Sequence, residues 1–220
     1  FTAYLALLGV SLIWTVAATI FWFAVFQDLA MYIVNTAIGK RLGVEPLLRM
    51  DFWEGVPDQS KAGIVFNVLL ASETSLSDIE ANLQRTLRNN EDKNTRIIIL
   101  ADLPEAKTDL LSFADEKAIA SAQRFVEGLN EKYARSAGFA PYYLFLRNRV
   151  WNERQQAWMG WERKRGAVVE LNRWLLAPDE PHNFRVITGD TEALRGTKYV
   201  LTLDEDTEVP HGMARRFVEI

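Results

Sequence analysis

Cysteine is absent from this sequence, so the chain forms neither a disulfide framework nor a thiolate metal site. Histidine is scarce as well, and His182 and His211 lie in no motif that indicates a catalytic base or a metal ligand. An excess of positive charge is also missing, because the net charge is −4 at pH 7, which argues against nucleic-acid binding. With 49% hydrophobic and 25% charged residues, the sequence is that of a folded protein whose core comes from packing alone.

Charge is missing altogether from the start of the chain, where Asp28 is the first charged residue. The segment Phe1–Phe26 is rich in Leu, Ile, Val, Ala, Phe and Trp, and it exceeds the about 20 apolar residues that cross a hydrocarbon core. A secretory signal peptide fits poorly, since the segment has no initiating Met and no basic region before it. Residues 1–42 are therefore predicted to be a transmembrane and juxtamembrane helical segment in a lipid bilayer, with a buried helix as the alternative.

Basic residues follow the apolar stretch closely. By the positive-inside rule, Lys40, Arg41 and Arg49 predict that the chain continues on the cytoplasmic side of the membrane. Residues 43–61 are expected to be a connector that leads the chain off the membrane. Because the sequence opens inside an apolar helix and stops at Ile220, soon after its most distinctive motif, we expect it to be part of a larger polypeptide.

Four apolar runs of strand length alternate with helical patterns in residues 62–220. The strands are expected at Ala62–Ala71, Thr95–Asp102, Tyr142–Leu146 and Tyr199–Leu203. Apolar residues at helical spacing predict helices within residues 76–87, 118–133 and 166–176. Ser75 and Asp78 resemble a capping box before the first of these helices. The alternation predicts an α/β fold with a mostly parallel sheet, helices on both faces and ligands at the carboxyl ends of the strands.

Three acidic residues, Asp204, Glu205 and Asp206, end what is expected to be a buried strand. Since side chains on a strand repeat every two residues, Asp204 and Asp206 are expected to point to the same side. Paired carboxylates of this kind can hold a hard divalent cation that is shared with the phosphates of a nucleotide diphosphate. A solvated turn is the alternative interpretation of the same residues.

Two other classes of acidic motif can be tested by comparing the residues that each requires with those in this sequence. An EF-hand loop that starts at Asp204 needs Gly and Glu where Val209 and Arg215 stand, so that class is excluded. Phosphatases of the haloacid dehalogenase class need Thr or Val where Glu208 stands. Such a phosphatase, with Asp204 as nucleophile, remains an alternative function, and a non-catalytic scaffold that binds a nucleotide sugar is another.

The stretch Arg147–Arg165 interleaves basic residues with three tryptophans. Its last residues, Arg163, Lys164 and Arg165, stand just before a predicted helix whose first residues include Gly166. Cationic side chains and free backbone N–H groups at a helix start form an anion site, so a phosphate-facing loop is predicted. The alternative is a solvated basic face, with the tryptophans in the core or at a membrane interface.

Three stretches resemble the glycosyltransferase domain of the membrane-bound cyclic beta-1,2-glucan synthases. They are "LLRMDFWEGVPD" (Leu47–Asp58), "WNERQQAWMGWERKRG" (Trp151–Gly166) and "LRGTKYVLTLDEDTEVP" (Leu194–Pro210). The run W-M-G-W-E-R-K-R-G is far more specific than any D-x-D motif. Because the three stretches follow in the same order, the resemblance covers nearly the whole chain after Gly43.

The resemblance implies a GT-A type domain, a Rossmann-like fold set between transmembrane helices, of which residues 62–220 would be the N-terminal part. Such a domain takes glucose from UDP-glucose on the cytoplasmic side of the bacterial inner membrane and transfers it to a growing glucan acceptor. Its implied partners are UDP-glucose, the glucan, the bilayer and the remainder of the polypeptide. The catalytic base of such enzymes follows the D-x-D motif and is expected beyond Ile220.

Site residues are also implied by the resemblance, position by position. Asp204 and Asp206 match the D-x-D that binds the diphosphate and a metal ion, Mg²⁺ or Mn²⁺. Asp102, at the end of the second strand, matches the acid that contacts the uridine. Ser72 and Glu73, after the first strand, lie where the fold closes on the nucleotide.

A second donor-binding group is implied in the basic stretch. Lys164, Arg165 and Gly166 resemble the K-x-G of related processive transferases, and their charge would neutralise the diphosphate. Asn172 stands about a helical turn later than the pattern of those transferases requires, so no role is assigned to it. Glu205 stands where the glucan synthases more often have a small residue, and its side chain is expected to face away from Asp204 and Asp206.

Overall fold

The computed structural model of the chain describes Gly9, residues 11–42 and residues 48–220, except for the side chains of residues 135–137. The chain divides into two compact units, Phe1–Leu48 and Arg49–Ile220. The first residues of the predicted transmembrane segment (1–8 and 10) and residues 43–47 of the predicted connector lie outside the described residues. We call the second unit the α/β unit.

The first unit contains one long helix, α2 (Leu12–Leu42). Its 31 residues correspond to a length of about 46 Å, which exceeds the thickness of about 30 Å of a hydrocarbon core. The helix runs through Asp28, carries exposed apolar side chains along its length and has Lys40 and Arg41 in its last turn. By length and composition, α2 is therefore able to cross a membrane.

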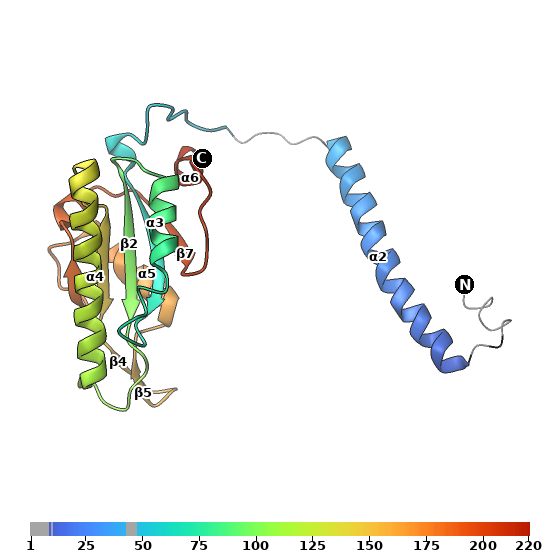
Figure 1. Ribbon diagram of the computed structural model, residues 1–220, viewed down its shortest axis with the longest axis horizontal. Coiled ribbons are helices and arrows are strands. Elements are labelled where there is room, and N and C mark those ends of the chain that lie inside the picture. The colour runs from blue at the N-terminus through green and yellow to red at the C-terminus, as the bar shows by residue number, and fades with distance from the viewer. Residues whose placement is uncertain (1–8, 10, 43–47) are drawn as a thin grey trace. The chain divides into compact units, whose positions relative to one another are not determined.

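The α/β unit is built on a five-stranded sheet with the strand order β6-β3-β2-β1-β7 (Figure 1). The strands are β1 (Ala62–Leu69), β2 (Thr95–Asp102), β3 (Tyr142–Arg147), β6 (Phe184–Thr188) and β7 (Tyr199–Asp204). The pairs β1–β2, β1–β7 and β2–β3 are parallel, and β6 pairs with β3 in antiparallel fashion. The predicted α/β fold with a mostly parallel sheet is confirmed.

Helices cover both faces of this sheet. The helices of the α/β unit are α3 (Glu80–Asn89), α4 (Phe113–Ala137), α5 (Arg163–Leu176) and α6 (Met213–Glu219), with short 3₁₀ helices at Asp58–Ser60 and Thr191–Leu194. In Figure 1, α3 and α4 lie in front of the sheet and α5 lies behind it. One core cluster joins the front helices to residues such as Phe66 and Ile99, and the other joins α5 to residues such as Val65 and Phe145. Alternate residues of each strand thus feed two separate cores.

The predicted and observed strands differ at the edges of the sheet. The central strands β1, β2 and β3 are almost wholly buried, as apolar runs in a parallel sheet should be. The last predicted strand is not buried, because β7 lies at the edge of the sheet and its residues are intermediate or exposed. Three strands were not predicted from the sequence: β6, and the hairpin of β4 (Val150–Asn152) and β5 (Ala157–Met159). Helix α6 was not predicted either.

The described part of the predicted connector packs onto the α/β unit. Phe52 and Val56 form a small buried cluster with Val218 of α6, at the amino ends of β1 and β7. The backbone N–H of Met50 donates to the carbonyl of Glu219 at 2.7 Å, and that of Phe52 donates to the Glu219 carboxylate at 3.2 Å. Residues 49–61 therefore close the end of the sheet opposite the carboxyl ends of its parallel strands.

Candidate functional site

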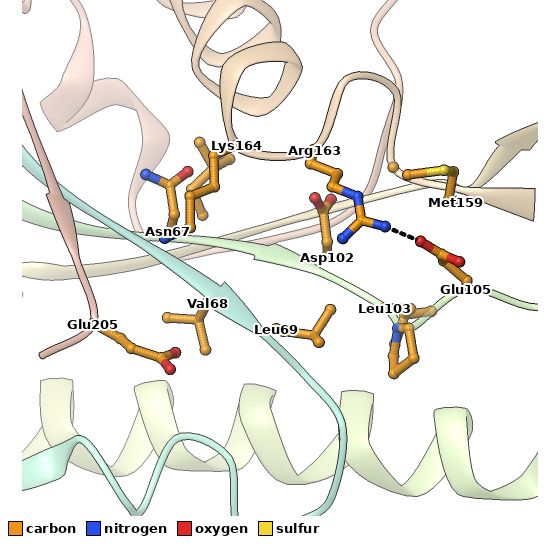
Figure 2. A pocket seen from close by; sticks show the side chains of 13 residues that line it. Asn67, Val68, Leu69, Asp102, Leu103, Glu105, Met159, Arg163, Lys164 and Glu205 are labelled. Carbon is orange, nitrogen blue, oxygen red and sulfur yellow. Dashed lines mark hydrogen bonds and ion pairs between the residues drawn. The ribbon is translucent and has the colours of Figure 1, made fainter. Parts of the chain in front are cut away.

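A pocket of about 410 Å³ opens at the carboxyl ends of β1 and β2, and we call it the strand-end pocket (Figure 2). Its walls come from five places in the chain: Asn67–Leu69, Leu100 and Asp102–Glu105, Met159–Gly160, Arg163–Lys164, and Glu205. The chain leaves β1 toward β2 on one side, while β7 lies on the other side of β1. The strand order therefore switches between β1 and β7, and Glu205, directly after β7, extends the pocket wall to that point. Open parallel sheets bind ligands at such switch points.

The side chains around this pocket point to two different faces of the sheet. Figure 2 shows Asn67, Asp102, Arg163 and Lys164 on one side of the strands, with Val68 and Glu205 on the other. Val68 belongs to the core beneath α3 and α4, whereas the polar group lies on the side of α5. The charged wall of the pocket is therefore built on the α5 face.

Arg147, the last residue of β3, holds that wall together. Its side chain is fully buried and makes two hydrogen bonds to the carboxylate of Asp102, from Nε at 2.8 Å and from Nη2 at 2.6 Å. Both partners are charged and the geometry is bidentate, which makes this the strongest type of side-chain pair. The buried pair ties the end of β2 to the end of β3.

The same guanidinium also fixes the beginning of α5. Nη1 donates to the carbonyl of Trp161 and Nη2 to the carbonyl of Arg163, each at 2.9 Å. Glu170 of α5 lies 3.6 Å away, and burial raises the pKa of its carboxyl although Arg147 opposes that shift. Sequence analysis missed Arg147 as a structural residue because it stands in a basic stretch, although it directly ends the apolar run "YYLFL".

Two glycines of the W-M-G-W-E-R-K-R-G run make this arrangement possible. A Cβ on Gly160 would lie 2.6 Å from Arg147 Nη2 and 2.6 Å from the Asp102 carboxylate. A Cβ on Gly166 would lie 1.8 Å from the carbonyl oxygen of Trp161. Gly166, a predicted donor-binding residue, is therefore a close-packing residue whose N–H donates to Glu162 within the helix, and it does not line the pocket.

Lys164 connects the pocket to the acidic strand end. It lines the pocket, and its ammonium group contacts the Asp204 carboxylate at 2.5 Å, with both side chains largely exposed. Arg163, Lys164 and Arg165 were expected to stand just before a helix. Helix α5 instead begins at Arg163, so the three basic residues form its first turn. Cations at the positive end of a helix dipole are unfavourable, and a bound anion would relieve this.

The acidic motif is a strand end followed by a turn. Strand β7 ends at Asp204, and the next residues turn so that Thr207 N–H donates to the carbonyl of Asp204 at 3.0 Å. Strand alternation therefore does not extend to Asp206, and it is Glu205 that lines the pocket. The side chain of Asn82 fastens the turn by donating to the carbonyls of Glu205 and Thr207.

The donor set of this turn suits a hard cation. Among the described residues, no group of three or more His, Asp or Glu side chains is arranged to hold a metal ion. Mg²⁺, however, commonly takes one or two carboxylates together with waters and substrate phosphates, so Asp204 and Asp206 fit it chemically. Because Lys164 already contacts Asp204, a cation there would compete with the ammonium group.

The remaining predicted site residues lie apart from the pocket lining. Ser72 and Glu73 belong to the turns after β1, where Glu73 pairs with Lys117 of α4 at 3.5 Å. The Arg165 side chain is 84% exposed and pairs with Glu162. Of the predicted site residues, the structure thus places Asp102 and Lys164 in the pocket lining, and Asp204 contacts Lys164 from outside it. Ser72, Glu73, Arg165 and Asp206 also lie outside the lining.

Asn67 is a pocket residue that sequence analysis overlooked. It is 9% exposed, and its amide oxygen has no hydrogen-bond partner among the described residues. A buried polar atom without a partner is costly, so a ligand that donates a hydrogen bond would be favoured here. The signal was present in the sequence, since Asn67 interrupts the otherwise apolar run of β1.

Fold and site together define an α/β protein with a pocket at the carboxyl ends of its parallel strands, flanked by cationic and acidic side chains. No protein-family model matches the sequence. The chain is 30% identical over 189 residues to the cyclic beta-(1,2)-glucan synthase NdvB of Rhizobium meliloti (strain 1021). The match covers 86% of this chain and 6% of that protein, so the chain spans a small part of its relative's length. The resemblance drawn from the motifs is confirmed for this domain-sized stretch.

Proposed function

We propose that this chain carries the donor-binding part of a membrane-bound glycosyltransferase that uses UDP-glucose to extend a beta-1,2-linked glucan. The observation that carries the proposal is the strand-end pocket, where Asn67, Asp102 and Lys164 meet and Lys164 contacts Asp204. Similarity to a glucan synthase supports the chemistry assigned to it. The partial GT-A domain at residues 62–220 is part of the same proposal.

The pocket has an apolar part and a charged part, as a nucleotide diphosphate requires. Leu69 and Leu103 would contact the base, and the unpaired amide oxygen of Asn67 would accept a hydrogen bond from the nucleoside. Both oxygens of Asp102 already bind Arg147, yet each carboxylate oxygen accepts more than one hydrogen bond. The predicted contact between Asp102 and the uridine is therefore compatible with its structural role.

The diphosphate would lie against the first turn of α5. Arg163 and Lys164 line the pocket there and supply positive charge, and the helix dipole adds to it. A Mg²⁺ or Mn²⁺ ion held by Asp204 and Asp206 would contribute Lewis-acid stabilisation of the same negative charge. Ser72, Glu73 and Arg165 would have to act from outside the lining, through contacts made when the donor binds.

The proposed transfer forms one bond and breaks one. The oxygen of an acceptor hydroxyl bonds to C1 of the donor glucose, and the bond from C1 to the diphosphate breaks with its electron pair leaving on UDP. The hydroxyl proton passes to a general base. Lys164 would stabilise the charge that develops on the departing diphosphate, where preorganised cations have their largest effect.

The membrane setting belongs to the same proposal. Helix α2 is long and apolar enough to anchor the chain, and Lys40 and Arg41 in its last turn favour a cytoplasmic position for the residues after it. In this proposal UDP-glucose is supplied from the cytoplasm. The α/β unit would therefore bind its donor at the cytoplasmic face of a bacterial inner membrane.

The test is incorporation of labelled glucose from UDP-glucose by membranes that carry the full-length protein, with and without EDTA. We expect EDTA, Asp206→Asn and Lys164→Ala each to reduce incorporation at least about a hundredfold, as loss of a group that stabilises leaving-group charge does. Asp179→Asn is the matched control, since that carboxylate is exposed, pairs with Arg195 and is not part of the pocket lining. Two results together would refute the metal-assisted site: undiminished incorporation by the wild type in EDTA, and incorporation at the wild-type level by Asp206→Asn.

A further inference from the structure

A second cavity, of about 620 Å³, lies beside the strand-end pocket, between the β4–β5 hairpin and the start of α5. We call it the hairpin cavity. Figure 1 shows the hairpin at the end of the α/β unit toward which β2 points, so both hollows open at the same end of the sheet. They share two wall residues, Met159 and Arg163. A ligand in one is therefore adjacent to a ligand in the other.

Two tryptophans form aromatic walls of the hairpin cavity. Trp151 is 43% exposed and Trp161 is 41% exposed, and both line the hollow. Large apolar side chains that remain partly exposed in a concavity rimmed by polar groups mark a binding site. The polar groups come from the hairpin itself and include Asn152 and Gln155.

Both tryptophans are held in place. Trp151 packs against Trp158 across the hairpin, with ring centroids 6.0 Å apart, and Trp158 exchanges two backbone hydrogen bonds with Ala106, at 2.8 and 2.9 Å. The backbone of Trp161 is fixed by its carbonyl, which accepts a hydrogen bond from buried Arg147, and its ring lies against Gly166. Rigid aromatic walls lose little entropy when they bind a ligand.

The backbone around this cavity is strained. Among the described residues, the non-glycine positions with positive φ are Gln156, Glu162 and Arg163, at 51°, 50° and 47°. Glu162 and Arg163 line the hairpin cavity, and Gln156 lies in the turn of the hairpin. Strain of this kind costs about 1–3 kcal/mol per residue and is concentrated at functional sites.

We infer that the hairpin cavity is the acceptor subsite, where a glucose unit at the growing end of a beta-linked glucan binds against Trp151 and Trp161. This inference rests on the proposed function, since it needs a transferase with its donor in the strand-end pocket. A beta-glucose ring carries its hydroxyls at the rim and exposes C–H groups on its faces, and these faces suit the negative face of an indole ring. The rim hydroxyls would bind Asn152, Gln155 and Glu162.

The test measures binding apart from transfer. The full-length protein in detergent is titrated by calorimetry with a short beta-1,2-linked gluco-oligosaccharide, in the absence of UDP-glucose. We expect Trp151→Ala to weaken binding about tenfold and Trp151→Phe to keep most of the affinity, because the aromatic face remains. Trp53→Ala is the matched control and should bind like the wild type, since Trp53 is 74% exposed and not part of the cavity lining.

The outcomes separate this inference from the proposed function. Oligosaccharide binding that depends on Trp151, in a protein that transfers no glucose from UDP-glucose, would retain the hairpin cavity as a glucan-binding site but refute the proposed function and, with it, the acceptor role. Equal affinity in wild type and Trp151→Ala, or no binding by the wild type, would overturn the subsite. A lower melting temperature of Trp151→Ala with unchanged affinity would also overturn it, because Trp151 would then be packed against another part of the protein.

Discussion

Arg147 shows how a single buried charge can organise a surface site. Its guanidinium contacts Asp102 of β2 and two carbonyls at the start of α5, so three segments meet on one side chain. A buried charge costs several kcal/mol to desolvate, and this cost is offset only when the geometry of the pair is good. The pair therefore contributes less to net stability than to the position of the pocket wall.

Removing Asp102 should reveal this role. Asp102→Ala leaves the buried Arg147 without its carboxylate, and we expect the free energy of unfolding of residues 49–220 to fall by about 3–5 kcal/mol. Lys164→Ala removes an exposed ion pair and should change that free energy by less than about 1 kcal/mol. Urea unfolding of the two variants checks both values, and equal losses would contradict the structural role of Asp102.

At the scale of the element, the start of α5 depends on close packing and the start of α4 on capping. Gly166 lets α5 approach the backbone of Trp161, as no larger residue could. At α4, Ser112 caps the helix and Asp115 returns a hydrogen bond to the Ser112 backbone, so the capping box is complete. The capping box predicted at Ser75 and Asp78 does not begin a helix, because residues 72–79 form turns and α3 begins at Glu80.

Two glycine-to-alanine substitutions are expected to change the free energy of unfolding in opposite directions. Gly166→Ala places a methyl group 1.8 Å from the Trp161 carbonyl oxygen and should cost about 3 kcal/mol of unfolding free energy, or prevent folding. Gly128→Ala, inside α4 with no atom within 4 Å of its Cβ, should stabilise the fold by about 0.5–1 kcal/mol. Thermal unfolding of both variants is the measurement. A stabilised Gly166→Ala would show that the close approach is wrong.

The capping box should also make stability depend on pH. Burial alone would raise the pKa of Asp115, but hydrogen bonds from Arg149 and Ser112 outweigh it and lower that pKa below its usual value. The carboxylate therefore stabilises the fold fully above its unfolded pKa of about 3.9, and this contribution is lost as the pH falls through the folded pKa.

Asp115→Asn should cost about 2 kcal/mol of unfolding free energy at pH 7, since it leaves Arg149 with a weakened partner. The difference from wild type should narrow below about pH 4, where the wild-type carboxyl takes up its proton. Glu116→Gln, one residue on and exposed, is the control and should change stability by less than about 1 kcal/mol. A difference that does not depend on pH would contradict the role of the Asp115 charge.

At the scale of the whole molecule, the chain combines a helix able to cross a membrane with an α/β unit that has its own cores. The α/β unit begins at Arg49, and residues 49–61 are packed against α6 and the amino ends of β1 and β7. The part of the predicted connector that the structure describes is therefore integral to the folded unit.

Deletion of residues 1–48 should release the α/β unit from membranes without unfolding it. We expect the shortened protein to appear in the supernatant after a carbonate wash and to keep its cooperative unfolding, because none of its core clusters includes α2. Val25→Lys tests membrane insertion of α2 without deleting the helix, since a charge at the centre of a spanning helix costs about 2.5–3.5 kcal/mol of insertion free energy. Retention of the shortened protein in the membrane pellet would show that α2 is not its anchor.

Local patterns in the sequence determined the central strands of the sheet, the helices α3, α4 and α5 that cover it, and the apolar helix α2. The run "TRIIILAD" became β2 with the predicted bounds, because a parallel strand buried on both faces needs a continuous apolar run. Short or half-polar elements were not predictable in this way. Strand β6 and the three-residue strands of the hairpin have no such run, and they form because a neighbouring strand or loop pairs with them.

The candidate site shows the same division. The sequence by itself determined that acidic, basic and glycine residues stand at the ends of strands and helices, because those residue types recur in recognisable motifs. Only the tertiary structure decided which of them meet: Lys164 with Asp204, Asp102 with Arg147, and Asn67 at the wall of the pocket. These contacts join residues that are far apart in the chain, and their partners are set by strand order and helix packing, which no local pattern encodes.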